Sequence, residues 1–291
     1  MANTSAPFGF SQYQGTGSSP TFEQTQLAII STSTTPIYLG DPVCQSGSAT
    51  TGIPNGYIQQ AVAPYTVTVT AVAYATGVAT ITFNALTTAP LVGSSIALTG
   101  FTSTGATISG IYVIQTASTT TVTVNMPQNG VFVAAGTATI YTPVAGIFVG
   151  CRYLSVAQKR PVWQNYWQGS DANGDVIAYV ITDPNAQFVV QTANSNTTAT
   201  AVGFTNVGNN IGFALGTGTA ANGLSGAYAD QYTLTSGLAN PLLPFRIIAL
   251  ANYVPGAISP LASINGNDNT TAYNRIVVGF NNAQPRAFVG M

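Results

Sequence analysis

Histidine is absent from this sequence, and charged residues are scarce. The 291 residues contain six Lys and Arg and seven Asp and Glu, together 4% of the chain. Without histidine the chain cannot form Ser-His-Asp or Cys-His nucleophilic systems, zinc sites that use His, or His-based proton transfer near neutral pH. So few basic residues provide no positive stripe to neutralise a phosphate backbone, and nucleic-acid binding is not expected.

Cysteine is rare, and export signals and long apolar runs are missing. Cys44 and Cys151 are too few for a disulfide scaffold, so we expect buried thiols, with a bridge between the two as the alternative. The N-terminus lacks a positively charged region and a continuous apolar run, which predicts synthesis in the cytoplasm without a secretory signal. The apolar stretch at 241–258 is broken by proline, arginine and asparagine, so no membrane span is predicted.

What remains is an apolar and neutral chain. Hydrophobic residues make up 46% of it, and the formal net charge is −1, so copies repel one another very little. Disordered chains usually combine low hydrophobicity with high net charge, which is the opposite composition. We therefore expect a folded protein that assembles with partners or with itself as a homo-oligomer.

The pattern of residues predicts a mainly all-β fold. From 66 to 141, segments such as TVTVTAVAYA and VATITFNA alternate apolar and polar residues between Gly and Pro turns, which predicts about six or seven short strands. Pro64 and Pro143 flank this span, as expected if its first and last strands lie side by side. We read 64–142 as an inserted small β module, sandwich or barrel, within a β-sandwich or barrel host domain made of 21–63 and 143–291.

The N-terminal residues 1–20 predict an extended arm. They are rich in Ser, Gly, Gln and Pro, and the isolated aromatics Phe8, Phe10 and Tyr13 favour an arm laid on a neighbouring molecule over a disordered tail. The next segment, 21–30, is compatible with a helix or with a strand. The Gly-rich and Asn-rich region 203–228 predicts irregular turns or a loop ordered by a neighbour.

The segment QKRPVWQNYWQGSDANGD at 158–175 holds both tryptophans and four of the charged residues. Trp, Tyr and Arg dominate buried contacts between proteins, so this segment is a candidate interface. The alternative is that both tryptophans, expected on one face of a helical turn or strand, fill the core, and that the local charges pair with each other. The candidate interface residues of the whole chain are Phe8, Phe10, Tyr13, Lys159, Arg160, Trp163, Tyr166 and Trp167.

The sequence DANGD at 171–175 allows three interpretations. The Asn173-Gly174 pair predicts a tight hairpin turn. Asp171 and Asp175 would be the best pair of carboxylates for cleaving a sugar polymer, but the turn is the stronger interpretation. The same residues match the opening of a calcium loop, and that match fails at Val176 and Thr182. We therefore predict no catalytic residue, no cofactor and no metal, with calcium as a weak alternative.

Two segments resemble known proteins. The segment VTAVAYATGVATITFNALTTAPLVGSSIALTGF, continued by ISGIYVIQTASTTTVTV, resembles a small β module within structural proteins of tailed bacteriophages. The segment GIFVGCRYLSVAQKRPVWQNYWQGSDANGDVIAYVITDPNAQFVVQ is similar to phage virion proteins associated with the head. The resemblance implies a virion structural protein and transfers no catalytic residue.

Taken with the composition, the resemblance predicts a non-enzymatic capsid decoration or cement protein. Its expected partners are the major capsid protein or other virion proteins, and its expected location is the virion. Two alternatives stay open: a tail or fibre component that binds host surface glycans, and a polysaccharide-cleaving enzyme.

Overall fold

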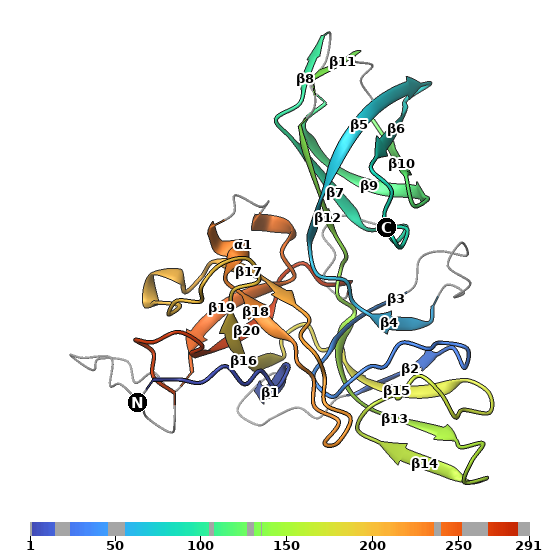
Figure 1. The fold of residues 1–291 in the computed structure, drawn as a ribbon, viewed down its shortest axis with the longest axis vertical. Coiled ribbons are helices and arrows are strands. Elements are labelled where there is room, and N and C mark those ends of the chain that lie inside the picture. Colours follow the sequence, from blue (N-terminus) through green and yellow to red (C-terminus); the bar gives the residue numbers. More distant parts are fainter. Residues whose placement is uncertain are drawn as a thin grey trace. The chain divides into compact units, whose positions relative to one another are not determined.

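Strands make up nearly all of the regular structure. The computed structural model describes residues 2–14, 24–45, 56–104, 108–126, 131–134, 136–235, 240–251 and 267–284. Within these ranges, helical structure comprises α1 (Tyr232–Thr235), the 3-10 turns η2 (Phe204–Asn206) and η3 (Asn240–Leu242), and the single 3-10 residue Gln284. The prediction of an all-β protein is confirmed (Figure 1).

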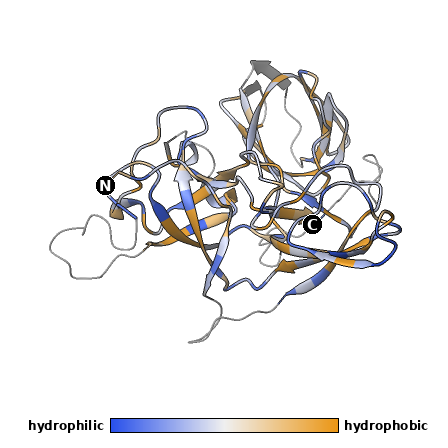
Figure 2. Ribbon diagram, turned by 60° about the horizontal axis from the view of Figure 1, so that its bottom comes forward, coloured by the Kyte–Doolittle hydropathy of each residue, from blue (hydrophilic) through white to orange (hydrophobic). Residues whose placement is uncertain are grey.

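The chain divides into two compact units. Unit 1 contains Met1–Cys44, Tyr57–Ala61 and Val144–Phe288, and unit 2 contains Gln45–Gly56, Val62–Pro143 and Val289–Met291. The module expected at 64–142 lies within unit 2. Strands of both units carry mixed hydrophobic and hydrophilic residues (Figure 2), as expected for strands with one buried face.

Unit 2 is built around a closed antiparallel barrel of six strands. Their order is β10 (Thr121–Asn125), β6 (Val78–Phe83), β5 (Tyr65–Ala75), β12 (Thr137–Tyr141), β7 (Ser95–Thr99) and β9 (Gly110–Ala117). The first and last of these strands along the chain, β5 and β12, pair with each other, as the flanking prolines predict. A separate two-stranded sheet joins β8 (Thr102–Thr104) and β11 (Val131–Ala134).

The long strand β5 explains how the barrel closes. Its first part pairs with β12, its second part pairs with β6, and a register shift falls between Val69 and Ala71. Such a bulge bends a strand, so that its two parts can pair with different neighbouring strands. Thr76 and Gly77, both with positive φ, form the two-residue turn from β5 to β6. The alternating apolar side chains of the six strands fill the barrel as a single core.

The first sheet of unit 1 is also closed through its hydrogen bonds. Its order is β1 (Ser11–Gln14), β16 (Gln187–Ala193), β18 (Tyr228–Asp230), β17 (Asn210–Ala214), β19 (Phe245–Leu250) and β20 (Arg275–Phe280). An additional pairing of β20 with β16 joins the ends of the circuit and leaves β1 outside it. The region 203–228 contributes η2 and β17 to this part of the fold, so it is not only the set of turns or the neighbour-ordered loop that was expected.

The second sheet of unit 1 carries the segment that the sequence singled out. Its order is β2 (Thr25–Ile29), β15 (Val176–Ile181), β13 (Gly146–Leu154), β3 (Pro42–Gln45) and β4 (Ile58–Gln60), and β14 (Pro161–Gln164) pairs with β13. The strand β2 settles the open choice for 21–30, because the described part of that segment is extended and not helical. Apolar residues of this sheet, including the buried Trp167, form a core of their own.

The N-terminal segment lies on its own chain. The Asn3 side chain donates a hydrogen bond to the carbonyl oxygen of Asp268 at 2.7 Å, and β1 pairs with β16. Phe10 is 2% exposed and stacks on Phe245, with 4.5 Å between the ring centroids. The expectation of an arm laid on a neighbour is therefore wrong for residues 2–14, and Phe10 is a core residue of unit 1. Residues 15–20 lie outside the described part of the chain.

Candidate functional site

The two tryptophans have opposite environments. Trp163 lies on β14 and is 64% exposed, whereas Trp167 is completely buried. The expected common face is wrong because β14 ends at Gln164, and the chain then turns inward so that Trp167 forms a backbone bridge with Ile37. Trp167 packs edge-on against Tyr153 at 5.3 Å between ring centroids. The core interpretation thus holds for Trp167, and only Trp163 faces solvent as a candidate contact.

The other candidate interface residues also differ in exposure. Lys159 and Arg160 are exposed on the loop before β14, and Tyr13 is 49% exposed. Phe8 is half-buried, with the guanidinium carbon of Arg275 5.3 Å from the centre of its ring.

Tyr166, also half-buried, stacks on Tyr38 at 5.6 Å between ring centroids. Of the candidates, Phe10 and Trp167 are buried in the core, and the others are half-buried or exposed.

The Asn173-Gly174 pair is not the centre of a hairpin. The strands on its two sides, β14 and β15, both pair with β13 and do not pair with each other. Gly174 has a positive φ of 84°, so the local turn preference is met, but the connection passes around β13. The hairpin prediction is wrong because β13 separates the two strands.

The two aspartates of this connection organise loops. Asp171 accepts hydrogen bonds from the Ser155 hydroxyl at 2.5 Å and the Ala157 amide at 2.8 Å. These donors favour the carboxylate and lower the pKa of Asp171 below its ordinary value. Asp175 accepts a hydrogen bond from the Tyr57 hydroxyl at 2.5 Å. Within the described chain neither carboxylate forms an ion pair with Lys159 or Arg160, contrary to the expected pairing.

A small aromatic platform covers the outer side of β13. Trp163 on β14 stacks on Tyr179 on β15, with 5.5 Å between the ring centroids and an angle of 16° between the ring planes. The guanidinium carbon of Arg152, on β13 between them, lies 5.2 Å from the centre of the indole. The two contacts hold the indole in a defined orientation although most of its surface is open to solvent.

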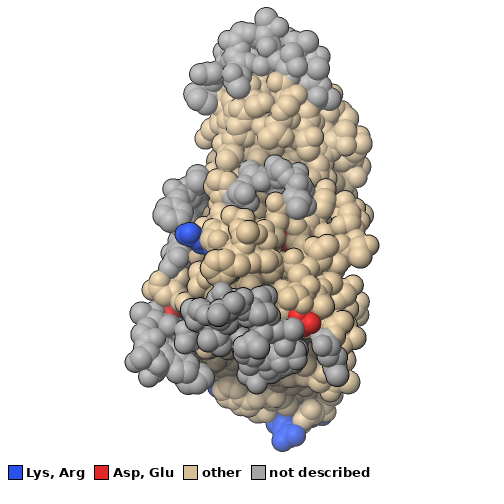
Figure 3. Space-filling model, turned by 90° about the vertical axis from the view of Figure 1, so that its left-hand side faces the viewer, with Lys and Arg blue, Asp and Glu red and all other residues tan. Residues whose placement is uncertain are grey.

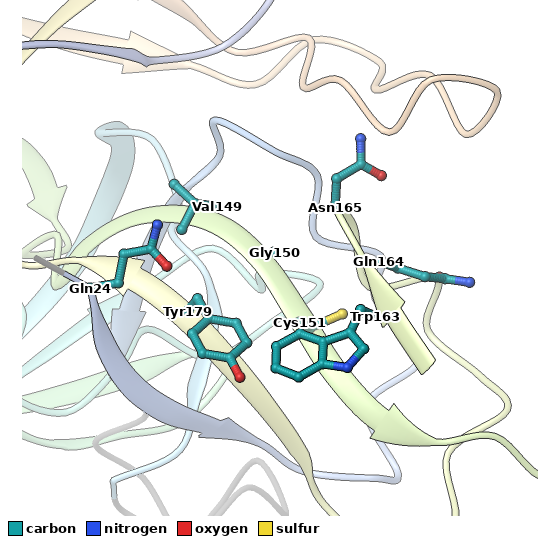
Figure 4. A pocket seen from close by; sticks show the side chains of 8 residues that line it. All are labelled: Gln24, Val149, Gly150, Cys151, Trp163, Gln164, Asn165 and Tyr179. Atoms are coloured by element: carbon teal, nitrogen blue, oxygen red, sulfur yellow. The ribbon is translucent and has the colours of Figure 1, made fainter. Parts of the chain in front are cut away.

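A hollow of about 390 Å³ lies beside this platform. Figure 4 shows the lining residues Gln24, Tyr179 and Trp163 in a row, with Gly150 of β13 above them in the view and the Gln164 side chain pointing away from Trp163. Gly150 follows the register shift in β13, has a φ of 152°, and would bring an added Cβ to 3.0 Å from the Gln164 carbonyl oxygen. The strand needs glycine here because a side chain would crowd β14.

Of the platform and the hollow, Trp163 was predicted from the sequence as a candidate contact, whereas Tyr179, Arg152 and Gln24 were not. Tyr179 alternates with the buried Ala178 and Val180, so its outward direction could have been read from the strand pattern. The contact between Tyr179 and Trp163 could not be predicted from the sequence, because it depends on which strands lie on either side of β13.

A buried carboxylate lies elsewhere in unit 1. Asp41 is 2% exposed and accepts hydrogen bonds from the Ser225 hydroxyl at 2.5 Å, the Tyr38 amide at 2.8 Å and the Gln60 side-chain amide at 2.8 Å. Burial raises the pKa of Asp41 above its ordinary value, although all three hydrogen bonds act in the opposite direction. Burial likewise raises the pKa of the Cys151 thiol to about 12.

The described residues contain neither a cluster of metal ligands nor a helix able to span a membrane. No three His, Cys, Asp or Glu side chains come together as metal ligands within the ranges that the structure covers. None of the helices in those ranges has the length and apolar character needed to cross a membrane. In comparisons with known proteins, no family model, curated protein or solved structure matches the chain.

Proposed function

We propose that this chain is a non-enzymatic structural protein of a bacteriophage virion, a decoration or cement protein that bridges the shell subunits of the capsid. The observation that carries the proposal is a surface with very little charge that nevertheless exposes large apolar side chains. The face of the molecule in Figure 3 shows only a few charged side chains. Phe204 is 63% exposed and Val156 57% exposed, on a chain whose units have hydrophobic cores of their own.

Such a surface favours binding through apolar burial. Phe204 lies in η2, which is tied to β19 by a hydrogen bond from the Gly208 amide to the Ile247 carbonyl oxygen, and Ile248 on β19 is also exposed. Contiguous apolar patches mark contact sites in soluble proteins, and Phe204 and Ile248 belong to elements that contact each other. Because charge contributes little, attachment to the major capsid protein or to other virion proteins should depend weakly on salt.

The experiment that tests this proposal is a release assay on particles purified by density gradient. We expect the chain to stay on particles in high salt and to leave them in mild urea, and a Phe204→Asp variant to attach less than wild type. A Thr205→Asp variant adds the same charge to a neighbouring exposed position and controls for the charge itself. Release by moderate salt with retention in urea would contradict attachment by apolar contacts.

The Trp163 platform favours a second candidate function, a tail or fibre component that contacts host surface glycans. An open indole beside a hollow is unnecessary for a protein that only thickens a coat. A few copies in each particle, confined to the tail, would favour this candidate over the first.

A further inference from the structure

Trp163 presents a flat ring that is already ordered. The stacking contact with Tyr179 and the guanidinium of Arg152 orient the indole, and 64% of the side chain remains exposed. A ligand that stacks on this ring therefore loses little free energy to ordering the side chain. Because the platform lies entirely within unit 1, its geometry is set by β13, β14 and β15 alone.

The lining of the hollow is uncharged and combines apolar with polar groups. Its polar side chains include the amides of Gln24 and Asn165 and the hydroxyl of Tyr179, and none of the lining residues is a carboxylate or an amine. The Asn165 Nδ2 donates a hydrogen bond to the Asn222 carbonyl oxygen at 2.7 Å, which directs the amide group and leaves its Oδ1 as an acceptor. The Gln24 amide and the Tyr179 hydroxyl have no hydrogen-bond partner in the described part of the chain.

These groups match one kind of ligand better than the others. A cation would find no opposite charge among the lining side chains, and the Arg152 guanidinium of the platform is held against the Trp163 indole. Hydroxyl groups, in contrast, can both donate to and accept from amides. A pyranose ring combines hydroxyl groups at its rim with an apolar face that covers an aromatic ring. The volume of about 390 Å³ falls at the lower end of the range for small-molecule sites, which suits one or two sugar rings.

We propose that the hollow beside Trp163 binds a neutral oligosaccharide. The apolar face of one sugar ring stacks on the Trp163 indole, and its hydroxyl groups bond with the Gln24 amide, the Tyr179 hydroxyl and the Asn165 Oδ1. The inference rests on the second candidate function, contact with host surface glycans, and gives its ligand class and contacts; it does not rest on the capsid proposal.

The test uses the purified full chain and a panel of neutral hexasaccharides of glucose, galactose, mannose and N-acetylglucosamine. Binding is followed by saturation-transfer NMR of the sugars and by tryptophan fluorescence. We expect at least one sugar to bind, Trp163→Ala to weaken that binding by about tenfold or more, and Gln24→Ala to weaken it less. The matched control is Phe204→Ala, because Phe204 is exposed to the same extent, 63% against 64% for Trp163.

Three results would overturn the inference. The first is that no hexasaccharide binds, and the second is that Phe204→Ala weakens binding as much as Trp163→Ala does. The third is that a proline-rich peptide binds in a Trp163-dependent way while the sugars do not, which would make the platform a peptide site. The emission of the buried Trp167 confirms in each variant that unit 1 is folded. Because the assay uses the isolated chain, absence of the chain from virions would leave its result unchanged.

Discussion

Replacing Phe10 by Ala tests whether the N-terminal segment belongs to the fold of its own chain. Phe10 is 2% exposed, its ring stacks on Phe245 at 4.5 Å between centroids, and its amide donates a hydrogen bond to the Gly40 carbonyl oxygen at 2.9 Å. Truncating a buried Phe to Ala costs about 3–5 kcal/mol of unfolding free energy, from lost burial and from the cavity that remains. With a urea dependence of roughly 2–3 kcal/mol per molar, the midpoint should fall by roughly 1–2.5 M.

The assay is urea unfolding of the isolated chain, followed by tryptophan fluorescence. Both tryptophans, Trp163 and Trp167, lie in unit 1, so the signal reports unfolding of that unit. Tyr13→Ala is the control, because Tyr13 belongs to the same segment but is 49% exposed, and its loss should change stability by about 0.5 kcal/mol or less. If Phe10→Ala is as stable as Tyr13→Ala, the segment is not part of the core and the assignment of residues 2–14 to unit 1 is refuted.

Three further predictions concern other parts of the chain. Burial raises the pKa of Asp41 above its ordinary 3.8, so its contribution to stability is full below pH 3.8 and is lost as the pH rises through the folded-state value. The urea midpoint of wild type should therefore fall relative to that of Asp41→Asn as the pH is raised from below 3.8, and a constant difference would contradict this. The Asp171 carboxylate holds the loop before β14, so Asp171→Asn should speed tryptic cleavage after the exposed Lys159, and an unchanged cleavage rate would show that the loop does not need the carboxylate. Ile81→Ala, in the barrel core of unit 2, should destabilise that unit by about 2–5 kcal/mol, measured as faster hydrogen exchange in β6. The unfolding transition of unit 1, detected by tryptophan fluorescence, should not change. A matching shift of that transition would show that the two units unfold together.

The strands of unit 2 could be predicted because their signals are local. Alternation of β-branched and polar residues shows at each strand, and the Thr76-Gly77 turn follows directly from the sequence. The pairing of β5 with β12 followed from the prolines at the ends of the module.

The wrong predictions depended on contacts between distant segments. Phe10 looks like part of an arm because its partner, Phe245, lies near the other end of the chain. Asn173-Gly174 has the local chemistry of a hairpin turn, but β13 lies between β14 and β15 and prevents their pairing. Neither the contact of Phe10 with Phe245 nor the position of β13 between β14 and β15 can be read from a local sequence pattern.

The candidate site was predictable only in part. The exposed Trp163 stood out by composition, whereas the platform requires Tyr179 on a strand that lies across β13. The hollow is also lined by Gly150 at a bulge, and a single glycine in a strand is not enough to predict a binding site.

Quantitative mass spectrometry of density-gradient-purified particles tests the proposed function most directly. The measurement compares the copy number of this chain with that of the major shell protein in the same particles. A decoration or cement protein should be present in numbers comparable to the shell protein. Absence of the chain from the particles would contradict a virion role and reopen the question of an enzyme.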